Sequence, residues 1–182
     1  MNFTVSAISD FGEDELRRIY SLLSPAQQEY INAKPGDKAL QSLAARALLA
    51  RIIGEQAISS LHRDRDGRPQ LKDRHVSLSH SDNFVAVAVG DRPVGIDIQL
   101  KRFVCEKTAA RVCCREETDF LQSSPDGFFT LWTLKEAYIK ATSTGFSKAV
   151  NTCFIKDGVP CSPEGKNFHT RQGDLFISVI EL

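Results

Sequence analysis

The order of periodic segments constrains the fold most strongly, because helix-like stretches followed by strand-like stretches occur twice along the chain. The helix-like segments are expected at 13–22, 25–33, 37–53, 108–121 and 128–141. The strand-like segments are expected at 75–78, 84–89, 94–99, 153–156 and 168–180. This order predicts an α+β protein with two similar lobes, 1–101 and 102–182. We expect the lobes to pack tightly as one functional unit, because no low-complexity linker separates them.

Local signals support the second and third predicted helices. Ser24 and Pro25 are typical of an N-cap followed by proline at the first helical position. On the third helix, Leu40, Leu43, Ala44, Ala47 and Leu48 are expected to form the buried stripe, and Gly54 to end the helix.

The composition narrows the class of protein. Lys plus Arg and Asp plus Glu number 23 each, which gives no global indication of a nucleic-acid or membrane surface. The start of the chain turns acidic and lacks the basic region of a signal peptide. The five cysteines are odd in number and show no C-x-x-C spacing, so we expect reduced thiols, no structural zinc and a cytoplasmic location. The adjacent Cys113 and Cys114 are attributed to helix packing rather than redox chemistry.

The last predicted strand of the first lobe carries the first candidate ligands. Residues two apart on a strand share a face, so Asp97 and Gln99 are expected to point outward while Ile96 and Ile98 face a core. Gly95 is expected to leave room for a ligand near the backbone. An Asp with a second oxygen donor is half of a Mg²⁺ site, whereas the alternative is a solvated polar face.

The helix predicted at 128–141 adds a second group. Trp132, Glu136 and Lys140 share a face by i, i+4 spacing. The simpler interpretation is a surface salt bridge, worth about 0.3–0.5 kcal/mol. The functional interpretation is that Glu136 completes a metal site while Lys135 and Lys140 hold phosphate oxygens. The third candidate element is the stretch 77–81, with sequence SLSHS. Its hydroxyls and imidazole could bind phosphate at a strand-to-loop junction. The alternative is that its histidine is only a hydrogen-bonded loop residue.

The motifs occur in the order Gly67-Arg68-Pro69, Ser77-Leu78-Ser79-His80-Ser81, Val94-Gly95-Ile96-Asp97-Ile98-Gln99 and Trp132-Thr133-Leu134-Lys135-Glu136-Ala137-Tyr138-Ile139-Lys140. In order and spacing the chain resembles 4'-phosphopantetheinyl transferases of the surfactin-synthetase-activating (group II) type, over nearly its whole length. The resemblance implies a pseudo-two-fold pair of lobes, each a small antiparallel sheet packed with helices, with coenzyme A bound between them.

The resemblance also implies roles for individual residues. Asp97, Gln99 and Glu136 would bind Mg²⁺, with Mn²⁺ as an alternative, and Asp97, Glu136 and Lys140 would be catalytic. The family usually has Glu where this chain has Gln99, which removes a full charge from the metal site. The coenzyme A contacts would come from Lys135 and Lys140 at the pyrophosphate, from His80, Ser79 and Arg68 at the nucleotide, and from Arg46 or Arg51.

The implied reaction is that of a holo-(acyl-carrier-protein) synthase, in which a carrier serine attacks the β-phosphate of coenzyme A and expels 3',5'-ADP. This reaction requires that the charge on the phosphate oxygens is neutralised and that the attacking and leaving oxygens lie in line with the phosphorus. Glu136 or a metal-bound water would accept the serine proton. Two alternatives remain: a catalytically weak homologue that binds coenzyme A or a carrier, and a metal-dependent nuclease, which the neutral charge disfavours.

The stretch 101–115 carries a local basic excess in a neutral chain. On one helix, Lys107, Arg111 and Arg115 would form a stripe at i, i+4, i+8 spacing. We expect this stripe to dock the acyl or peptidyl carrier protein, whose recognition helix is typically acidic as the resemblance implies; the alternative is a solvated helix face. A monomer is expected, with no nucleic acid and no membrane as partners.

Overall fold

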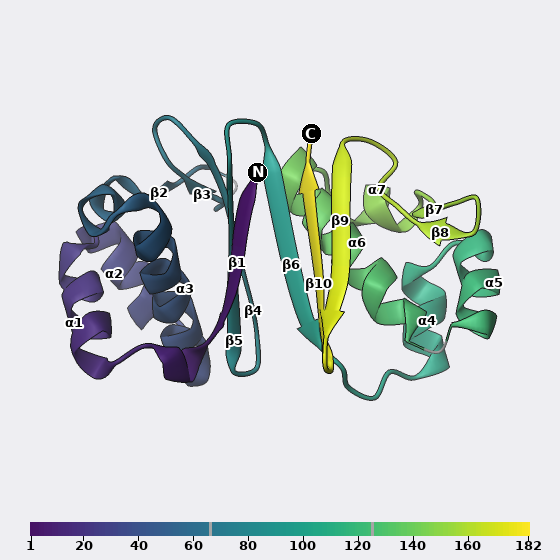
Figure 1. The fold of residues 1–182 in the computed structure, drawn as a ribbon, viewed down its shortest axis with the longest axis horizontal. Helices are drawn as coiled ribbons and strands as arrows, with labels where there is room; N and C mark the ends of the chain where they lie inside the picture. Colours follow the sequence, from purple (N-terminus) through teal and green to yellow (C-terminus); the bar gives the residue numbers. More distant parts are fainter. Residues whose placement is uncertain (66, 125) are drawn as a thin grey trace. The chain divides into compact units, whose positions relative to one another are not determined.

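The computed structural model describes residues 1–65, 67–124 and 126–182. The protein is α+β, as the sequence predicted, and divides into two compact units, Met1–Asp91 and Arg92–Leu182 (Figure 1). The predicted boundary after residue 101 falls later than the observed one. Strand β6 (Val94–Leu100) pairs with β10 (Leu175–Glu181), so its ladder hydrogen bonds place it in the second unit.

The first unit joins helices to an antiparallel sheet with the strand order β1-β5-β4-β3-β2. The strands are β1 (Asn2–Ala7), β2 (His62–Arg63), β3 (Pro69–Gln70), β4 (His75–Ser81) and β5 (Phe84–Gly90). The helices are α1 (Glu13–Leu22), α2 (Pro25–Asn32) and α3 (Asp37–Ile53), with the 3₁₀ turns η1 (Ile8–Asp10) and η2 (Glu55–Ser60). Strand β1 was not predicted.

Helix α3 supplies the centre of the first core. Its residues 44–50 are all buried, and all of them except Arg46 belong to a core cluster with the alternate β5 residues Val85, Val87 and Val89. A segment that is apolar on nearly every side is typical of a buried element. The predicted stripe is wrong at Leu40, which is 44% exposed.

The second unit contains a three-stranded sheet with the order β6-β10-β9 and a separate two-stranded sheet, β7-β8. Its helices are α4 (Glu106–Val112), α5 (Arg115–Ser123), α6 (Gly127–Thr142) and α7 (Phe146–Val150). Its other strands are β7 (Ile155–Lys156), β8 (Val159–Pro160) and β9 (Lys166–Gln172). Helix α6 lies against β6 and β10.

Two predicted elements of this unit are divided. The helix expected at 108–121 is interrupted at Cys113 and Cys114, which separate α4 from α5. The strand expected at 168–180 is a hairpin, β9–β10, that turns at Gly173 with φ +59°. Glycine adopts this left-handed conformation without the steric cost that a Cβ atom brings. In the described part of the chain, no helix combines the length and the apolar character that crossing a bilayer requires.

Candidate active site

An ion pair between β6 and α6 forms the centre of the candidate site. The Nζ atom of Lys140 lies 2.7 Å from Oδ1 of Asp97. The same ammonium group donates a hydrogen bond of 2.9 Å to the carbonyl oxygen of Ile96. Asp97 is only 7% exposed, so its carboxylate is held against the helix and does not belong to the solvated polar face that was the alternative.

Gly95 explains how strand and helix come so close. A Cβ atom there would lie 2.7 Å from the backbone nitrogen of Ala141 and closer still to the carbonyl oxygen of Ala137. The space is therefore filled by α6, which corrects the expectation that a ligand approaches the backbone at Gly95. Because residues two apart share a strand face, Asp97 and Gln99 are directed to the α6 side.

Glu136 lies one helical turn before Lys140. Burial raises the pKa of the Glu136 carboxyl, the negative charge of Asp97 raises that pKa further, and Lys140 opposes the shift. Two carboxylates that repel each other this way are a suitable donor set for a hard divalent cation, which prefers oxygen ligands. Asp97 and Glu136 therefore fit Mg²⁺ chemically as a pair of oxygen donors.

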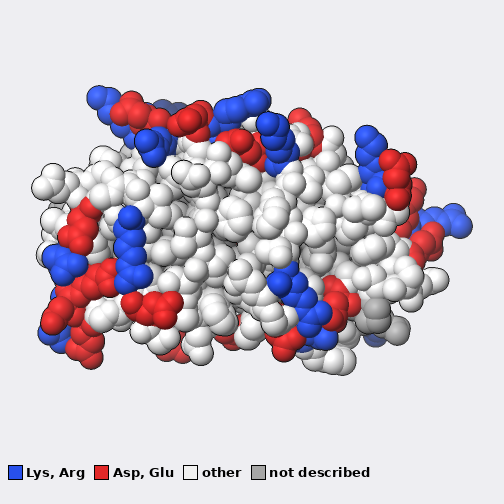
Figure 2. Space-filling view, viewed as in Figure 1, with Lys and Arg blue, Asp and Glu red and all other residues white. Residues whose placement is uncertain are grey.

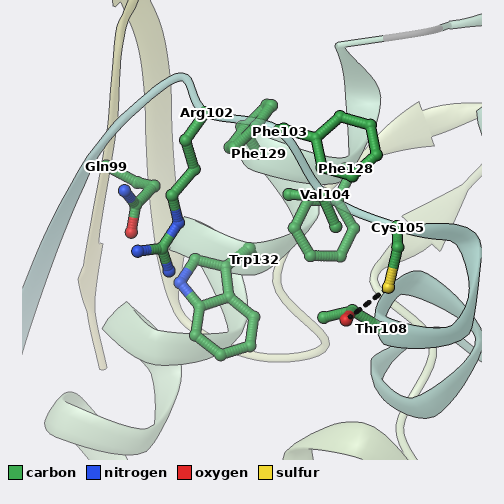
Figure 3. A pocket seen from close by; sticks show the side chains of 9 residues that line it. All are labelled: Gln99, Arg102, Phe103, Val104, Cys105, Thr108, Phe128, Phe129 and Trp132. Atoms are coloured by element: carbon green, nitrogen blue, oxygen red, sulfur yellow. Dashed lines mark hydrogen bonds between the residues drawn. The ribbon is translucent and has the colours of Figure 1, made fainter.

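Gln99 lies at the edge of a cavity of about 400 Å³ in the second unit. Its amide nitrogen donates a hydrogen bond of 2.9 Å to the carbonyl oxygen of Leu100. In Figure 3 the Arg102 side chain extends toward Gln99 and the Trp132 ring. The cavity is otherwise mostly apolar, and its lining residues include Phe103, Val104, Phe128 and Phe129.

Lys135 is placed differently from the expectation. Its side chain is 2% exposed, and its Nζ atom lies 2.8 Å from Oε2 of the fully buried Glu117. The same ammonium group donates to three backbone carbonyls, those of Ala149 (3.2 Å), Val150 (3.4 Å) and Thr152 (3.3 Å). An ammonium with these partners is a structural cation, so the expected contact with pyrophosphate does not fit this geometry.

The two candidate arginines of α3 are also engaged. Arg46 is 2% exposed and donates to the Gln27 side chain at 2.6 and 3.0 Å and to Ser42. Burial lowers the pKa of Arg46 to about 10. Arg51 forms a two-point ion pair with Glu15, at 2.7 and 2.8 Å. Neither guanidinium is presented to a ligand in the way the resemblance implied.

Similar ion pairs neutralise the surface around α1. Arg17 pairs with Glu13 and Arg18 with Glu55, at 2.9 and 2.8 Å. Figure 2 shows acidic and basic side chains side by side at this end of the first unit. Such mutual neutralisation agrees with the zero net charge of the chain.

A cationic cluster around Tyr30 was not predicted. The Arg63 guanidinium lies 3.9 Å from the centre of the Tyr30 ring, Lys34 Nζ at 4.4 Å and Arg46 at 5.3 Å. Burial acts to raise the pKa of the Tyr30 hydroxyl, but the hydrogen bond from Lys34 and the nearby positive charges lower it overall. An aromatic ring with several cations suits a phosphate-bearing ligand. Arg63 and Tyr30 are too far apart in sequence for periodicity to connect them.

The other expected nucleotide contacts lie in the same unit. Residues 77–81 form part of β4 rather than a junction with a loop, so Ser79 and His80 point to opposite faces of the sheet. Ser79 is buried and His80 is exposed. Arg68 lies in the β2–β3 hairpin, where its backbone N–H donates to Asp64 at 2.9 Å. Ser79 and His80 therefore do not converge through their side chains.

The expected docking residues are all exposed, but they do not share one helix. Lys107 and Arg111 belong to α4, whereas Arg115 begins α5. The single stripe at i, i+4, i+8 spacing is therefore wrong, although the three cations remain near one another in the chain.

Comparisons with known proteins identify the family of the chain. A family model described as the 4'-phosphopantetheinyl transferase superfamily matches residues 93–178. The chain is 34% identical over 134 residues to 4'-phosphopantetheinyl transferase gsp of Aneurinibacillus migulanus, covering 69% of this chain and 56% of that protein. It is 33% identical over 127 residues to 4'-phosphopantetheinyl transferase psf-1 of Bacillus pumilus, covering 63% and 54%.

A third relative is matched over more of its length. The chain is 26% identical over 158 residues to 4'-phosphopantetheinyl transferase Sfp of Bacillus subtilis (strain 168), covering 79% of this chain and 70% of that protein. The matches to gsp and psf-1 span only about half the length of those relatives. The segment that the family model matches contains Asp97, Glu136 and Lys140. By these matches, and as its motifs predicted, the chain belongs to the 4'-phosphopantetheinyl transferase superfamily.

Proposed function

We propose that this chain transfers the 4'-phosphopantetheine group of coenzyme A to a serine of an acyl or peptidyl carrier protein and releases 3',5'-ADP. The observation that carries the proposal is the convergence of Asp97 and Lys140, 2.7 Å apart, beside the partly buried carboxyl of Glu136. Phosphoryl transfer depends on this combination of cation and metal-binding oxygens, because it proceeds by positioning and charge neutralisation.

Asp97 and Glu136 would hold Mg²⁺ or Mn²⁺, with the Gln99 amide oxygen as a neutral third donor. When bound, the ion neutralises charge on the pyrophosphate oxygens. The raised pKa of Glu136 supports this assignment, because a nearby cation relieves the repulsion between the two carboxylates.

The remaining chemistry is assigned to the chain's own side chains. Lys140 supplies a positive charge for the phosphate oxygens. Glu136 accepts the proton of the carrier serine as its oxygen bonds to the β-phosphorus, and the bond from that phosphorus to the oxygen of 3',5'-ADP breaks.

The nucleotide end of coenzyme A is assigned to the first unit. The Tyr30 ring and the cations Lys34 and Arg63 offer an aromatic face and positive charge for a phosphorylated nucleotide. Buried Arg46 adds a positive charge without presenting its guanidinium. Arg68 and the exposed His80 remain candidates for the same ligand.

We assign the docking site of the carrier protein to the surface of the second unit around Gln99 and the cavity that this residue lines. Phe103 is 92% exposed beside the mostly apolar cavity, an arrangement that suits an apolar side chain of a partner. Lys107, Arg111 and Arg115 are exposed and add a positive rim for an acidic carrier helix.

The test is an intact-mass measurement on the carrier. The purified chain is incubated with coenzyme A, Mg²⁺ and an apo carrier protein, with EDTA and no-coenzyme controls. The account predicts a carrier that gains the mass of phosphopantetheine, with one 3',5'-ADP released for each modified carrier. Coenzyme A binding without any mass gain, across acyl and peptidyl carriers, would show a catalytically idle homologue instead.

A further inference from the structure

A second cluster of reactive side chains lies in the second unit, apart from the Asp97–Lys140 pair. The ligand atoms of Cys114, Glu117 and Cys153 all lie within 4.8 Å of one another. Both cysteines are free thiols and are partly exposed, whereas Glu117 is fully buried. Two thiols and a carboxylate at this distance suggest either a metal site or a dithiol site.

The bonds of Glu117 argue against a metal. Its Oε2 atom accepts the Cys114 backbone N–H at 2.8 Å and lies 2.8 Å from the Lys135 ammonium. Its Oε1 atom accepts the Phe154 backbone N–H, also at 2.8 Å. A divalent cation on this carboxylate would be placed beside a buried ammonium, and like charges close together in a poorly solvated environment repel strongly. The two sulfur atoms are therefore the reactive partners.

We propose that Cys114 and Cys153 form a reversible intramolecular disulfide, a modification site on the second unit. The thiolate of one cysteine attacks a small disulfide such as oxidised glutathione, which gives a mixed disulfide and one glutathione thiol. The second cysteine then displaces the remaining glutathione thiol. The chain loses two protons and two electrons, and the small disulfide is reduced to two thiols.

The backbone near both cysteines is already joined by Glu117. This carboxylate accepts the N–H of Cys114 itself and the N–H of Phe154, which follows Cys153. A bridge would connect segments that these hydrogen bonds hold together, so little backbone movement is needed to bring the sulfur atoms into bonding distance. The bridge would close the loop 114–153, which contains α5, α6 and α7, and would restrict the unfolded chain. The oxidised form is therefore more stable than the reduced form.

The experiment is oxidation of the whole chain with oxidised glutathione, followed by alkylation and intact-mass measurement under denaturing conditions. Wild type should remain monomeric and carry two fewer alkylated thiols than the five of the reduced chain. Trypsin leaves Cys113 and Cys114 in one peptide, so Cys113→Ser serves as the matched control. Cys113→Ser should form the bridge to the Cys153 peptide, whereas Cys114→Ser and Cys153→Ser should not.

Thermal unfolding gives the second readout. The melting temperature should rise on oxidation of wild type and Cys113→Ser, return with dithiothreitol, and stay unchanged in Cys114→Ser. Five alkylated thiols after oxidation, persistent glutathione adducts, or a bridge through Cys113, Cys105 or Cys161 would overturn the proposal. Zinc retained by wild type through dialysis and lost in Cys114→Ser would also overturn it, in favour of a metal site.

Discussion

The Lys135 ammonium lies 2.8 Å from the Glu117 carboxylate, and the two side chains are 2% and 0% exposed. Lys135 precedes Glu136 in the helix that carries the candidate site, yet it faces the interior. The pair connects α6 to α5, and the lysine also donates to carbonyls of residues 149, 150 and 152. Lys135 is thus a candidate for positioning α6 rather than for contacting substrate.

The first prediction concerns this buried pair. Lys135→Met should lower the free energy of unfolding by about 3–5 kcal/mol, because it leaves the Glu117 carboxylate buried without its counter-ion. Urea unfolding followed by circular dichroism measures the change. Lys148→Met, an exposed lysine of the same unit, is the control and should change stability little. Stability equal to wild type, together with a raised KM for coenzyme A, would restore Lys135 to the phosphate site.

The second prediction concerns the contact between β6 and α6. Gly95→Ala places a methyl group against the backbone of Ala137 and Ala141, so strand and helix must separate. Overpacking that shifts the backbone typically costs about 1–3 kcal/mol of folding stability, and occasionally more. We also expect transfer activity to fall, since Asp97 and Lys140 would move apart.

Gly145→Ala is a matched control, because a Cβ atom at Gly145 meets nothing within 4 Å. Urea unfolding and the transfer rate are measured for both variants. A Gly95→Ala protein as stable and as active as Gly145→Ala would contradict the close packing of β6 on α6.

The sequence predicted features that depend on local periodicity better than contacts between separate elements. The bounds of α1 and α3 followed from periodicity and from stop signals such as Gly54. Strand alternation placed Asp97 with Gln99 and i, i+4 spacing placed Glu136 with Lys140, but only the family resemblance brought the two groups into one site. Periodicity alone does not reveal which neighbouring element covers a face.

Two misassignments have that cause. Lys135 and Gly95 were interpreted as ligand-facing, but Glu117 and the α6 backbone occupy the space beside them. The Tyr30 cluster was missed because its cations come from α3, from the turn just after α2 and from the β2–β3 hairpin. The break between α4 and α5 falls at Cys113 and Cys114, without a glycine or proline to mark it.

The third prediction uses the raised pKa of Glu136. In the unfolded chain the Glu136 carboxyl has a pKa near 4.5, and in the folded protein its pKa is higher. The unfolded chain therefore loses this proton at a lower pH than the folded protein does. Ionisation of Glu136 thus lowers the free energy of unfolding as the pH rises from 4.5 through the folded pKa. Without metal, Glu136→Gln should therefore melt at a higher temperature than wild type at pH 7. The difference should shrink below pH 4.5.

Thermal unfolding in EDTA across this pH range measures the effect. Glu29→Gln, a change at an exposed glutamate, is the control and should show no such trend. A Glu136→Gln variant that melts below wild type at pH 7, in the absence of metal, would show that the carboxylate is stabilised rather than strained.

The fourth prediction concerns the proposed carrier surface. Arg111→Glu with Arg115→Glu should raise the KM for carrier protein about tenfold or more and leave the KM for coenzyme A nearly unchanged, since exposed charges steer encounter with a charged partner. A higher salt concentration should weaken carrier binding by the wild type more than it weakens carrier binding by the double variant. Steady-state kinetics at two salt concentrations measures both effects.

A control for net charge is Lys156→Glu with Lys166→Glu, which reverses two exposed cations elsewhere in the second unit. Equal effects of the two double variants on the carrier KM would move the docking surface away from Arg111 and Arg115.

The most direct test of the account is the initial rate of phosphopantetheine transfer by Asp97→Asn at saturating Mg²⁺. The account predicts a loss of about 100-fold or more, the scale expected when a group that stabilises transition-state charge is removed. Asp119→Asn, which removes an exposed carboxylate of α5, should retain the wild-type rate, and circular dichroism should show both variants folded. A folded Asp97→Asn protein that transfers at the wild-type rate would contradict the central claim.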